Sequence, residues 1–192
     1  MKVAVLDHGM GNLRSVAKAL EAAGGVVKVT DDGTEIDASD ALCVPGQGIF
    51  GRCMSNLTGR GSAELIRDWI GAERPYLGIC LGMQVLFSAS EEGGGHEGMG
   101  LIEGAVTRLP SSVRVPHIGW NSVEGEYFYF DHSYAVHPSD PTIVTGWCEH
   151  GDTFAARIET GSVLGVQFHP EKSAAAGIAL LSRWLKQPVS RS

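Results

Sequence analysis

The first part of the chain alternates between short apolar runs and stretches with helical spacing of apolar residues. Residues 2–6 form an apolar run that predicts a buried strand, and residues 13–20 then place apolar side chains at helical spacing. Gly24 and Gly25 end that helix, and residues 26–29 form a second apolar run. A strand, a helix and a strand in this order predict a parallel sheet with a right-handed crossover.

The same alternation continues to the middle of the chain. Residues 31–40 are polar and predict a loop or short connector before a buried strand at 41–44. Residues 61–71 show helical spacing, and Pro75 ends that pattern before a fourth apolar run. This run is a strand at 76–80, and a buried helix is expected at 83–87.

Beyond Met99 the pattern changes to short strands separated by turn residues. These strands are expected at residues 101–109, 117–123, 127–137, 143–148, 153–158 and 163–168, with a closing amphipathic helix at 174–186. The pattern predicts a single α/β domain over residues 1–192, with an open, mostly parallel central sheet flanked by helices. Additional mixed or antiparallel strands extend that sheet, as in flavodoxin-like folds.

Length and charge narrow the classes of partner. The chain has 192 residues with 43% hydrophobic and 19% charged side chains, which is ordinary for one globular domain. The net charge of −7 argues against nucleic acid or an anionic membrane surface as the main partner.

The cysteines and the start of the chain indicate a reducing compartment. The four cysteines are scattered without a Cys-x-x-Cys pair, so neither a zinc site nor a disulfide framework is indicated, and we expect no metal or cofactor. The start lacks a signal-peptide pattern, and no apolar run is long enough to span a bilayer. We therefore expect a cytoplasmic protein. Cys43 is expected in the core and Cys53 in a loop.

The segment Gly78-Ile79-Cys80-Leu81-Gly82 has the pattern of a nucleophile elbow, in which a reactive residue sits on a tight strand-to-helix turn. The turn would hold the Cys80 sulfur at the carboxyl end of the sheet, and the following helix dipole would favour a thiolate. The alternative is a buried cysteine at an ordinary strand end.

Two nearby segments would complete a pocket around Cys80. The turn Pro45-Gly46-Gln47-Gly48 exposes backbone N–H groups, and those of Gln47 and Gly48 would form an oxyanion hole with Leu81. Gln84 lies one helical turn beyond Cys80 and would face the same pocket. Glu91 and Glu92 follow at the expected helix end, where a carboxylate would bind an amino group.

A candidate base for Cys80 lies at the end of the last strand. His169 and Glu171 are two residues apart in extended chain, so their side chains share a side, and Pro170 stiffens the link. A carboxylate beside an imidazole sets its tautomer and stabilises the imidazolium. Cys80, His169 and Glu171 thus form a candidate Cys-His-Glu triad.

The turn Gly9-x-Gly11 lacks the third glycine of a dinucleotide-binding fingerprint, because Arg14 stands at that position. This turn therefore argues against nucleotide binding.

These motifs resemble those of the class I glutamine amidotransferases. The segments 78–84, 45–48 and 165–171 carry the general resemblance. Asp7–Val16 and Pro116–Asn121 are similar to the family of glutaminase subunits of imidazole glycerol phosphate synthase. The resemblance covers essentially the whole chain, with the motifs in the expected order.

The resemblance implies hydrolysis of L-glutamine to glutamate and ammonia through a glutamyl thioester on Cys80. It implies a heterodimer with a (β/α)8-barrel cyclase, which uses the ammonia to form imidazole glycerol phosphate and an aminoimidazole carboxamide ribotide in histidine biosynthesis. The substrate would be held by Gly46, Gln47, Gly48, Leu81, Gln84, Glu92, Asp131, His132, Ser133 and Tyr134, with Glu92 on the α-amino group. Residues at positions associated with the partner interface are Asn12, Trp120, Asn121 and Lys172.

The sequence departs from the family pattern at a few positions. His8 stands where tyrosine is expected, Gln47 where a small apolar residue is usual, and Asp131 where an apolar residue is expected. The segment 121–127 is short. Gln47 matters most, because the backbone at that position would complete the oxyanion hole.

Two other functions remain open at this point. One is a freestanding γ-glutamyl hydrolase or peptidase of the same fold, and the other is a non-enzymatic binding or redox-sensing protein. Residues 7–15 and Trp120 favour a subunit with a partner, because a freestanding hydrolase needs no such surface. The His169–Glu171 pair argues against a protein without catalytic activity.

Overall fold

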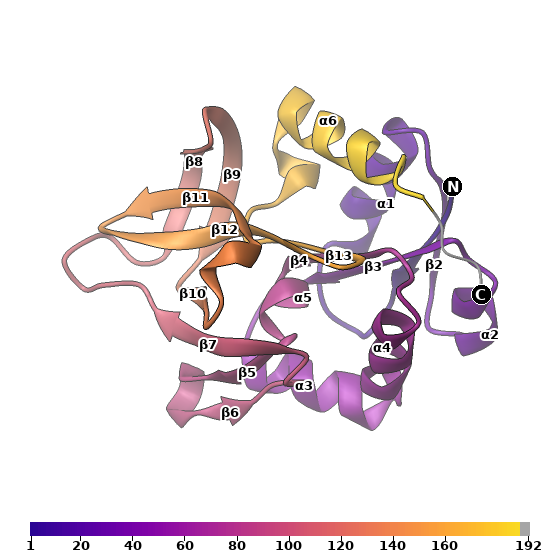
Figure 1. Cartoon of the computed structure of the whole chain (residues 1–192), viewed down its shortest axis with the longest axis horizontal. Helices are drawn as coiled ribbons and strands as arrows, with labels where there is room; N and C mark the ends of the chain where they lie inside the picture. The colour runs from indigo at the N-terminus through magenta and orange to yellow at the C-terminus, as the bar shows by residue number, and fades with distance from the viewer. Residues whose placement is uncertain (189–192) are drawn as a thin grey trace.

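Five parallel strands form the centre of the fold in the computed structural model, which describes residues 1–188 (Figure 1). They lie in the order β2-β1-β3-β4-β13. Their bounds are β1 Lys2–Leu6, β2 Val26–Thr30, β3 Ala41–Gly46, β4 Tyr76–Cys80 and β13 Val163–Val166. The predicted α/β fold with a mostly parallel centre is confirmed.

Antiparallel and mixed pairings extend this sheet beyond β13 in the order β12-β10-β7-β5-β6, and β11 pairs with β12. The bounds are β5 Phe87–Ser90, β6 His96–Glu97, β7 Ile102–Arg108, β10 Tyr134–Pro138, β11 Val144–His150 and β12 Asp152–Thr160. A separate two-stranded ribbon consists of β8 (His117–Val123) and β9 (Glu126–His132).

The strand expected over residues 127–137 is two strands. β9 pairs with β8 in the ribbon, whereas β10 pairs with β7 and β12 in the main sheet. One straight strand could not serve both sheets, so the chain bends at Ser133. The short segment 121–127 is explained by a tight hairpin. Only Glu124 and Gly125 separate the paired residues Val123 and Glu126, and these two turn residues both have positive φ.

Helices cover both faces of the parallel sheet (Figure 1). α1 (Leu13–Ala22) and α6 (Ala174–Trp184) lie on one face, and α2 (Gly33–Asp37), α3 (Phe50–Gly59) and α4 (Ser62–Gly71) lie on the other. Short 3₁₀ turns are η1 (Glu92–Gly94), η2 (Pro141–Ile143) and η3 (Pro170–Lys172). No helix within residues 1–188 has the length and apolar character that crossing a membrane requires.

The alternation of side chains along the strands divides the core into two layers. In β1, Val3 and Val5 pack in the cluster under α1 and α6, whereas Ala4 and Leu6 pack in the cluster with α3 and α4. Successive strand residues point to opposite faces, so a strand buried on both sides reads as one apolar run. This explains why the apolar runs predicted these strands.

The sequence prediction missed α3, and the expectation that Cys53 is a loop thiol is wrong. Cys53 is fully buried in α3, together with Phe50 and Leu57. These residues follow helical spacing, but glycines at positions 51 and 59 and polar neighbours weaken the local helix signal. Burial against the sheet therefore decides the conformation of this segment.

The buried helix expected at 83–87 is also wrong, because α5 spans only Leu81–Gln84 and β5 begins at Phe87. The carbonyl of Leu86 accepts hydrogen bonds from the backbone N–H groups of Leu101 and Ile102, and that of Val85 accepts one from Met99. These tertiary hydrogen bonds replace the ones a longer helix would make. The macrodipole of one helical turn is correspondingly small.

The register brings the carboxyl ends of three strands to one edge. Gly46 of β3 lies beside Cys80 of β4, and Val166 of β13 lies beside Ile79. The segments that follow these strands therefore meet at the edge where open α/β sheets bind ligands.

Gly82 provides a test of how tightly α5 packs against β3. A Cβ atom at Gly82 would lie 1.8 Å from the backbone oxygen of Val44, so Gly82→Ala forces the two backbones apart. We expect Gly82→Ala to lower the free energy of unfolding by about 3 kcal/mol, measured by urea denaturation. Gly71→Ala is the matched control, because a Cβ there meets no atom within 4 Å, and it should stabilise by roughly 0.5 kcal/mol. Equal stability of the two variants would contradict this packing.

Candidate active site

Cys80 occupies a strained turn between β4 and α5. Its φ of 54° and ψ of −110° are unusual for a residue with a side chain, and such conformations concentrate at functional sites. Glycines make the turn possible, because a Cβ would lie 2.5 Å from Leu81 Cβ at Gly46 and 2.5 Å from the Gly82 carbonyl oxygen at Gly78. The predicted strand-to-helix elbow is confirmed, with its cysteine buried at the carboxyl end of β4.

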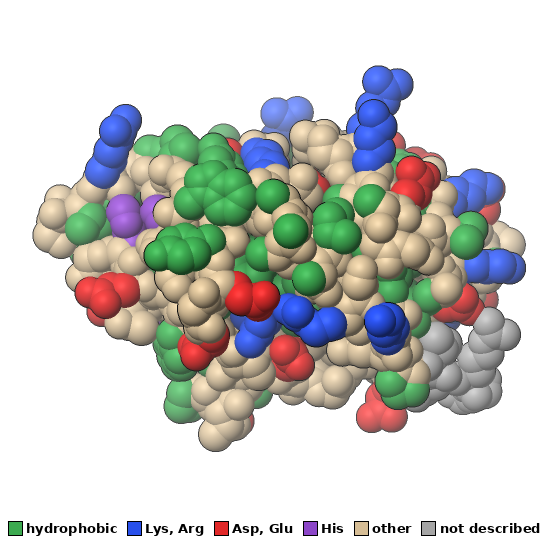
Figure 2. Space-filling view, turned by 90° about the horizontal axis from the view of Figure 1, so that it is seen from above, with side chains coloured by type: hydrophobic (Ala, Val, Ile, Leu, Met, Phe, Trp, Pro, Cys, Tyr) green, Lys and Arg blue, Asp and Glu red, His purple; other side chains and the backbone are tan. Residues whose placement is uncertain are grey.

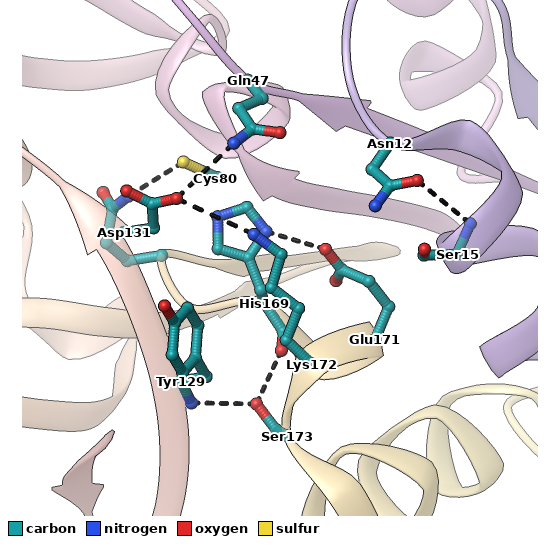
Figure 3. Close-up of polar contacts among 11 residues, drawn as sticks. Asn12, Ser15, Gln47, Cys80, Tyr129, Asp131, His169, Glu171, Lys172 and Ser173 are labelled. Atoms are coloured by element: carbon teal, nitrogen blue, oxygen red, sulfur yellow. Dashed lines mark hydrogen bonds and ion pairs between the residues drawn. The ribbon is translucent and has the colours of Figure 1, made fainter. Parts of the chain in front are cut away.

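His169 and Glu171 form a buried pair next to Cys80. His169 follows β13, and its Nδ1 donates a hydrogen bond of 2.8 Å to Glu171 Oε1. The two side chains are only 4% and 2% exposed. Nδ1 is engaged with the carboxylate, so Nε2 is the ring atom free for proton transfer, and it has no hydrogen-bond partner of ordinary geometry within residues 1–188. Figure 3 shows the imidazole between Cys80 and Glu171.

The surroundings keep His169 charged. Burial by itself lowers the pKa of His169, but interactions with Cys80 and with Glu171 outweigh this effect and raise the pKa to about 10. An imidazolium beside a cysteine sulfur favours the thiolate, which is the nucleophilic form. The pair of His169 and Glu171 therefore places a positive charge beside the Cys80 sulfur.

Backbone contacts from three elements hold the pair in place. Ser173 Oγ donates to the His169 carbonyl at 2.6 Å and accepts from the backbone N–H of Tyr129 at 2.9 Å. The His169 N–H donates to the Tyr129 carbonyl at 2.8 Å. Gly177 of α6 lies against Pro170, where a Cβ would come within 1.9 Å of the Pro170 oxygen. η3 is therefore fixed between β9 and α6.

A cavity of about 310 Å³ opens in front of the Cys80 sulfur. All predicted substrate-contacting residues except Gly46 line it. The lining consists of Gln47, Gly48, Cys80, Leu81, Gln84, Glu92, Pro116, Asp131, His132, Ser133 and Tyr134. Gly46 instead lies against Leu81 as the last residue of β3, where only a glycine fits.

The turn that would supply the oxyanion donors is tied to β1 through His8. The fully buried His8 ring donates a hydrogen bond of 2.6 Å from its Nε2 to the Pro45 carbonyl. A carbonyl oxygen can only accept, so Nε2 is the protonated ring nitrogen. Burial lowers the pKa of His8, which keeps the ring neutral. His8 thus positions the segment that leads to the backbone N–H groups of Gln47 and Gly48.

Glu92 lines the cavity but does not follow a helix, so the expected placement of Glu91 and Glu92 at a helix end is wrong. Both residues follow β5, and Glu92 begins η1. Glu92 Oε2 accepts a hydrogen bond of 2.7 Å from the backbone N–H of Phe50, at the start of α3. Its carboxylate therefore caps α3 at the cavity wall, where acidic groups stabilise a helix N-terminus.

The two atypical residues Gln47 and Asp131 meet at the mouth of the cavity. Gln47 Nε2 donates to Asp131 Oδ2 at 3.5 Å, and Lys172 Nζ lies 3.7 Å from the same oxygen (Figure 3). These long, partly exposed contacts contribute about 0–1 kcal/mol each. They nevertheless join the turn at residues 45–48 to β9 and η3 next to Cys80. The two residues that depart from the family pattern, Gln47 and Asp131, are therefore in contact.

The residues predicted at a partner interface differ in exposure. Trp120 is 53% exposed and meets Tyr129 edge to face, and Lys172 Nζ lies 5.5 Å from the centre of the Tyr129 ring. Asn12 is exposed and caps α1 through a hydrogen bond from the Ser15 N–H to its Oδ1. The half-buried Asn121, in contrast, uses its amide within the chain and donates to the Glu149 carbonyl at 2.9 Å.

Sequence reasoning missed Gln167, whose Nε2 donates to Cys80 Sγ at 3.4 Å. The signal was present, because Gln167 stands two residues before His169 at a strand end and so shares its side. No cluster of His, Cys, Asp or Glu among residues 1–188 has the arrangement of a metal site.

The environment of each cysteine predicts selective labelling. Burial raises the pKa of Cys53 and Cys148 to about 12 and that of Cys43 well above its ordinary value, whereas Cys80 faces the cavity. We expect iodoacetamide at neutral pH to modify the folded protein once, at Cys80, as read by peptide mass spectrometry. Cys80→Ser should remove the label and Cys53→Ser should keep it. Labelling of Cys53 in the native protein would contradict the assignment.

Solved structures share this architecture. A structure described as a glutamine amidotransferase superposes with a TM-score of 0.74 at 21% identity, over 94% of this chain and 98% of that one. The PurLQS structure from Thermotoga maritima gives a TM-score of 0.71 at 19% identity, over 96% and 99% of the two chains. These similarities establish the fold.

Sequence comparisons identify the family. A profile described as "Glutamine amidotransferase class-I" matches residues 4–187. The imidazole glycerol phosphate synthase subunit HisH of Moorella thermoacetica is 46% identical, over 95% of this chain and 93% of the relative. The HisH subunits of Aquifex aeolicus (43% identical, 97% of each chain) and Rhodopirellula baltica (41%, over 97% and 98%) match similarly. The chain therefore belongs to the class I glutamine amidotransferase family, and within it to the HisH subunits of imidazole glycerol phosphate synthase.

Proposed function

We propose that this protein hydrolyses L-glutamine to glutamate and ammonia as the glutaminase subunit of an imidazole glycerol phosphate synthase in histidine biosynthesis. The ammonia passes to a (β/α)8-barrel cyclase subunit. The observation that carries the proposal is the position of Cys80, which lines one cavity and lies next to the buried pair of His169 and Glu171. A volume of about 310 Å³ suits a single amino acid, at the small end of ligand pockets.

The first half of the reaction is attack by sulfur. The Cys80 thiolate adds to the side-chain amide carbon of glutamine, and the negative charge moves to the amide oxygen. Backbone N–H groups of Leu81 and of the 47–48 turn stabilise this oxyanion. His169 Nε2 then donates its proton to the amide nitrogen, the C–N bond breaks, and ammonia leaves a glutamyl thioester on Cys80.

The second half is hydrolysis of the thioester. His169, now neutral, accepts a proton from water as the water oxygen adds to the thioester carbon. The C–S bond breaks, glutamate leaves, and Cys80 returns to the thiolate beside the imidazolium. Glu171 holds Nδ1 protonated throughout, so Nε2 is always the nitrogen that exchanges the proton.

The rest of the cavity would recognise the amino-acid end of glutamine. Glu92 offers a carboxylate for the α-ammonium group, and the residues from His132 to Tyr134 also line the cavity. Oppositely charged partners in a partly enclosed site fix the orientation of a small ligand more strongly than in water.

An exposed apolar surface supports a partner rather than a freestanding hydrolase. Ile118, Trp120 and Tyr127 are 58%, 53% and 63% exposed, and the register of the β8–β9 ribbon places them on one face. Figure 2 shows hydrophobic side chains gathered over this part of the molecule. Contiguous exposed apolar residues mark interaction surfaces. We propose that this face and Lys172 contact the cyclase.

Ammonia release with and without a cyclase barrel tests the proposal. We expect the cyclase barrel, supplied with the phosphorylated ribulosyl substrate into which the ammonia is incorporated, to increase glutamine turnover, measured by coupled detection of glutamate. Cys80→Ala should reduce this turnover to background, whereas the matched Cys53→Ala variant should retain it. Strong hydrolysis of γ-glutamyl peptides without any response to the barrel would support the freestanding hydrolase instead.

The charge state of His169 sets the alkaline limit of activity. Its pKa is raised from 6.5 to about 10, so the imidazolium persists until the pH rises through about 10, and kcat/KM should fall there. The same shift stabilises the folded state fully below pH 6.5, and this stabilisation is lost as the pH rises through about 10.

Glu171→Gln should move the alkaline fall of kcat/KM to lower pH, because the carboxylate contributes to the raised pKa of His169. It should also lower kcat by roughly 10²–10⁴-fold, since the orientation of the imidazole weakens. The measurement is a pH profile of glutamine hydrolysis. An alkaline limb that stays at the wild-type position would show that Glu171 does not set the His169 charge.

A further inference from the structure

Cys80 has a second neighbour besides His169, on the inner side of the cavity. Gln167 is fully buried, and its Nε2 donates to Cys80 Sγ at 3.4 Å. Gln84 Nε2 donates to Gln167 Oε1 at 2.9 Å and to the Tyr134 carbonyl at 3.0 Å. The sulfur is thus joined through two amide side chains to the backbone of β10.

The direction of these hydrogen bonds is fixed by the Tyr134 carbonyl, which can only accept. The end of Gln84 that faces it must be the NH₂ group, and the same NH₂ group contacts Gln167. The Gln167 atom at that contact must therefore be its oxygen, which leaves its NH₂ group facing the sulfur. Neither amide can be reversed without placing two donors or two acceptors against each other.

The same carbonyl continues the chain toward the ribbon. His132 Nδ1 donates to the Tyr134 carbonyl at 2.9 Å, so its Nε2 is an acceptor. That nitrogen accepts from His117 Nδ1 at 3.0 Å, and His117 Nε2 then accepts from Asn121 Nδ2 at 3.2 Å.

Asn121 closes the chain with a second backbone anchor. Its Nδ2 also donates to the Glu149 carbonyl at 2.9 Å, and its Oδ1 accepts from the Ser122 N–H at 2.8 Å. The orientation demanded from this end agrees with the one demanded by Tyr134. One consistent set of tautomers and amide orientations therefore runs from β8 to the Cys80 sulfur.

The two histidines in this chain stay neutral. Burial lowers the pKa of His132 to about 3, and burial together with His150 lowers that of His117 to about 4. The His117 ring is also stacked between Phe130 at 4.7 Å and His150 at 4.0 Å. At neutral pH each donor and acceptor in this series of hydrogen bonds keeps its role, because neither histidine gains or loses a proton.

We propose that Gln167 is a positioning residue that donates a hydrogen bond to the Cys80 thiolate, and that Gln84, anchored on the Tyr134 carbonyl, holds its amide in the donating orientation. The hydrogen bonds from Asn121 through His117 and His132 end on the same carbonyl, so they connect the β8 strand of the partner-facing ribbon to this anchor. The inference rests on the proposed function, since it concerns the thiolate that attacks glutamine. A donor to a charged acceptor stabilises the charged form, so the sulfur should be deprotonated at lower pH with Gln167 than without it.

Gln167→Met tests the donor directly, because it keeps the side-chain length and removes both polar atoms. We measure the rate of iodoacetamide labelling of Cys80 against pH in the full chain. The labelling midpoint should move to higher pH, with labelling about tenfold slower below the wild-type midpoint. The control, Gln187→Met, makes the same substitution outside the site and should match the wild type. An unchanged profile in folded Gln167→Met protein overturns the proposal.

His117→Phe tests the chain behind Gln167 and remains informative if Gln167→Met does not fold. Phenylalanine can keep the stacking with Phe130 but breaks the hydrogen bonds on both sides. We expect a smaller shift in the same direction, and no further shift when the substitution is added to Gln167→Met. Additive shifts, or no shift at all in His117→Phe, overturn the connection to β8.

Glutamine turnover of the wild-type protein with the cyclase barrel separates two kinds of failure. If the wild type releases no ammonia, the proposed function fails, whatever the labelling shows. If the wild type turns over glutamine and Gln167→Met is labelled like the wild type, only the role of Gln167 fails.

Discussion

The contact between α5 and β3 is the constraint on which the site depends. Gly82 lies so close to the Val44 carbonyl that any side chain would separate the two elements. This closeness forces the chain to turn sharply after β4, and Cys80 takes up the strain with a positive φ. Because the sheet is packed on both faces, the turn cannot relax into either layer. The sulfur is held at the carboxyl end of β4, where the segments that follow β3 and β13 also lie.

The environment of the sulfur combines one charged and one neutral neighbour. His169 supplies a positive charge that Glu171 maintains, whereas Gln167 supplies a neutral donor with a fixed direction. In a buried site such groups act at low effective dielectric, so each has a larger effect on the sulfur than it would have in water. Both neighbours lie in the segment that directly follows β13, and this segment therefore supplies two polar neighbours of Cys80.

Much of the fold was predictable because strands buried on both faces appear as continuous apolar runs. Residues 2–6 and 76–80 are of this kind. The strand–helix–strand order over residues 2–29 predicted the parallel sheet. The failures have a common cause. α3 carries a weak local helix signal, and the segment after Gln84 carries a misleading one, so tertiary burial and hydrogen bonds to residues 99–102 determine both. Glu91 and Glu92 were misplaced for the same reason.

The sequence by itself predicted the elbow at Cys80 and the pairing of His169 with Glu171. Close spacing along the chain indicates which side chains share a side, and glycines indicate where backbones can approach, so these two features are local. Only the tertiary structure decided the contact between Gln47 and Asp131 and the hydrogen bonds that join Gln167 to Asn121. Such contacts join residues far apart in the chain, and their direction depends on which backbone carbonyls the folded sheets present to them.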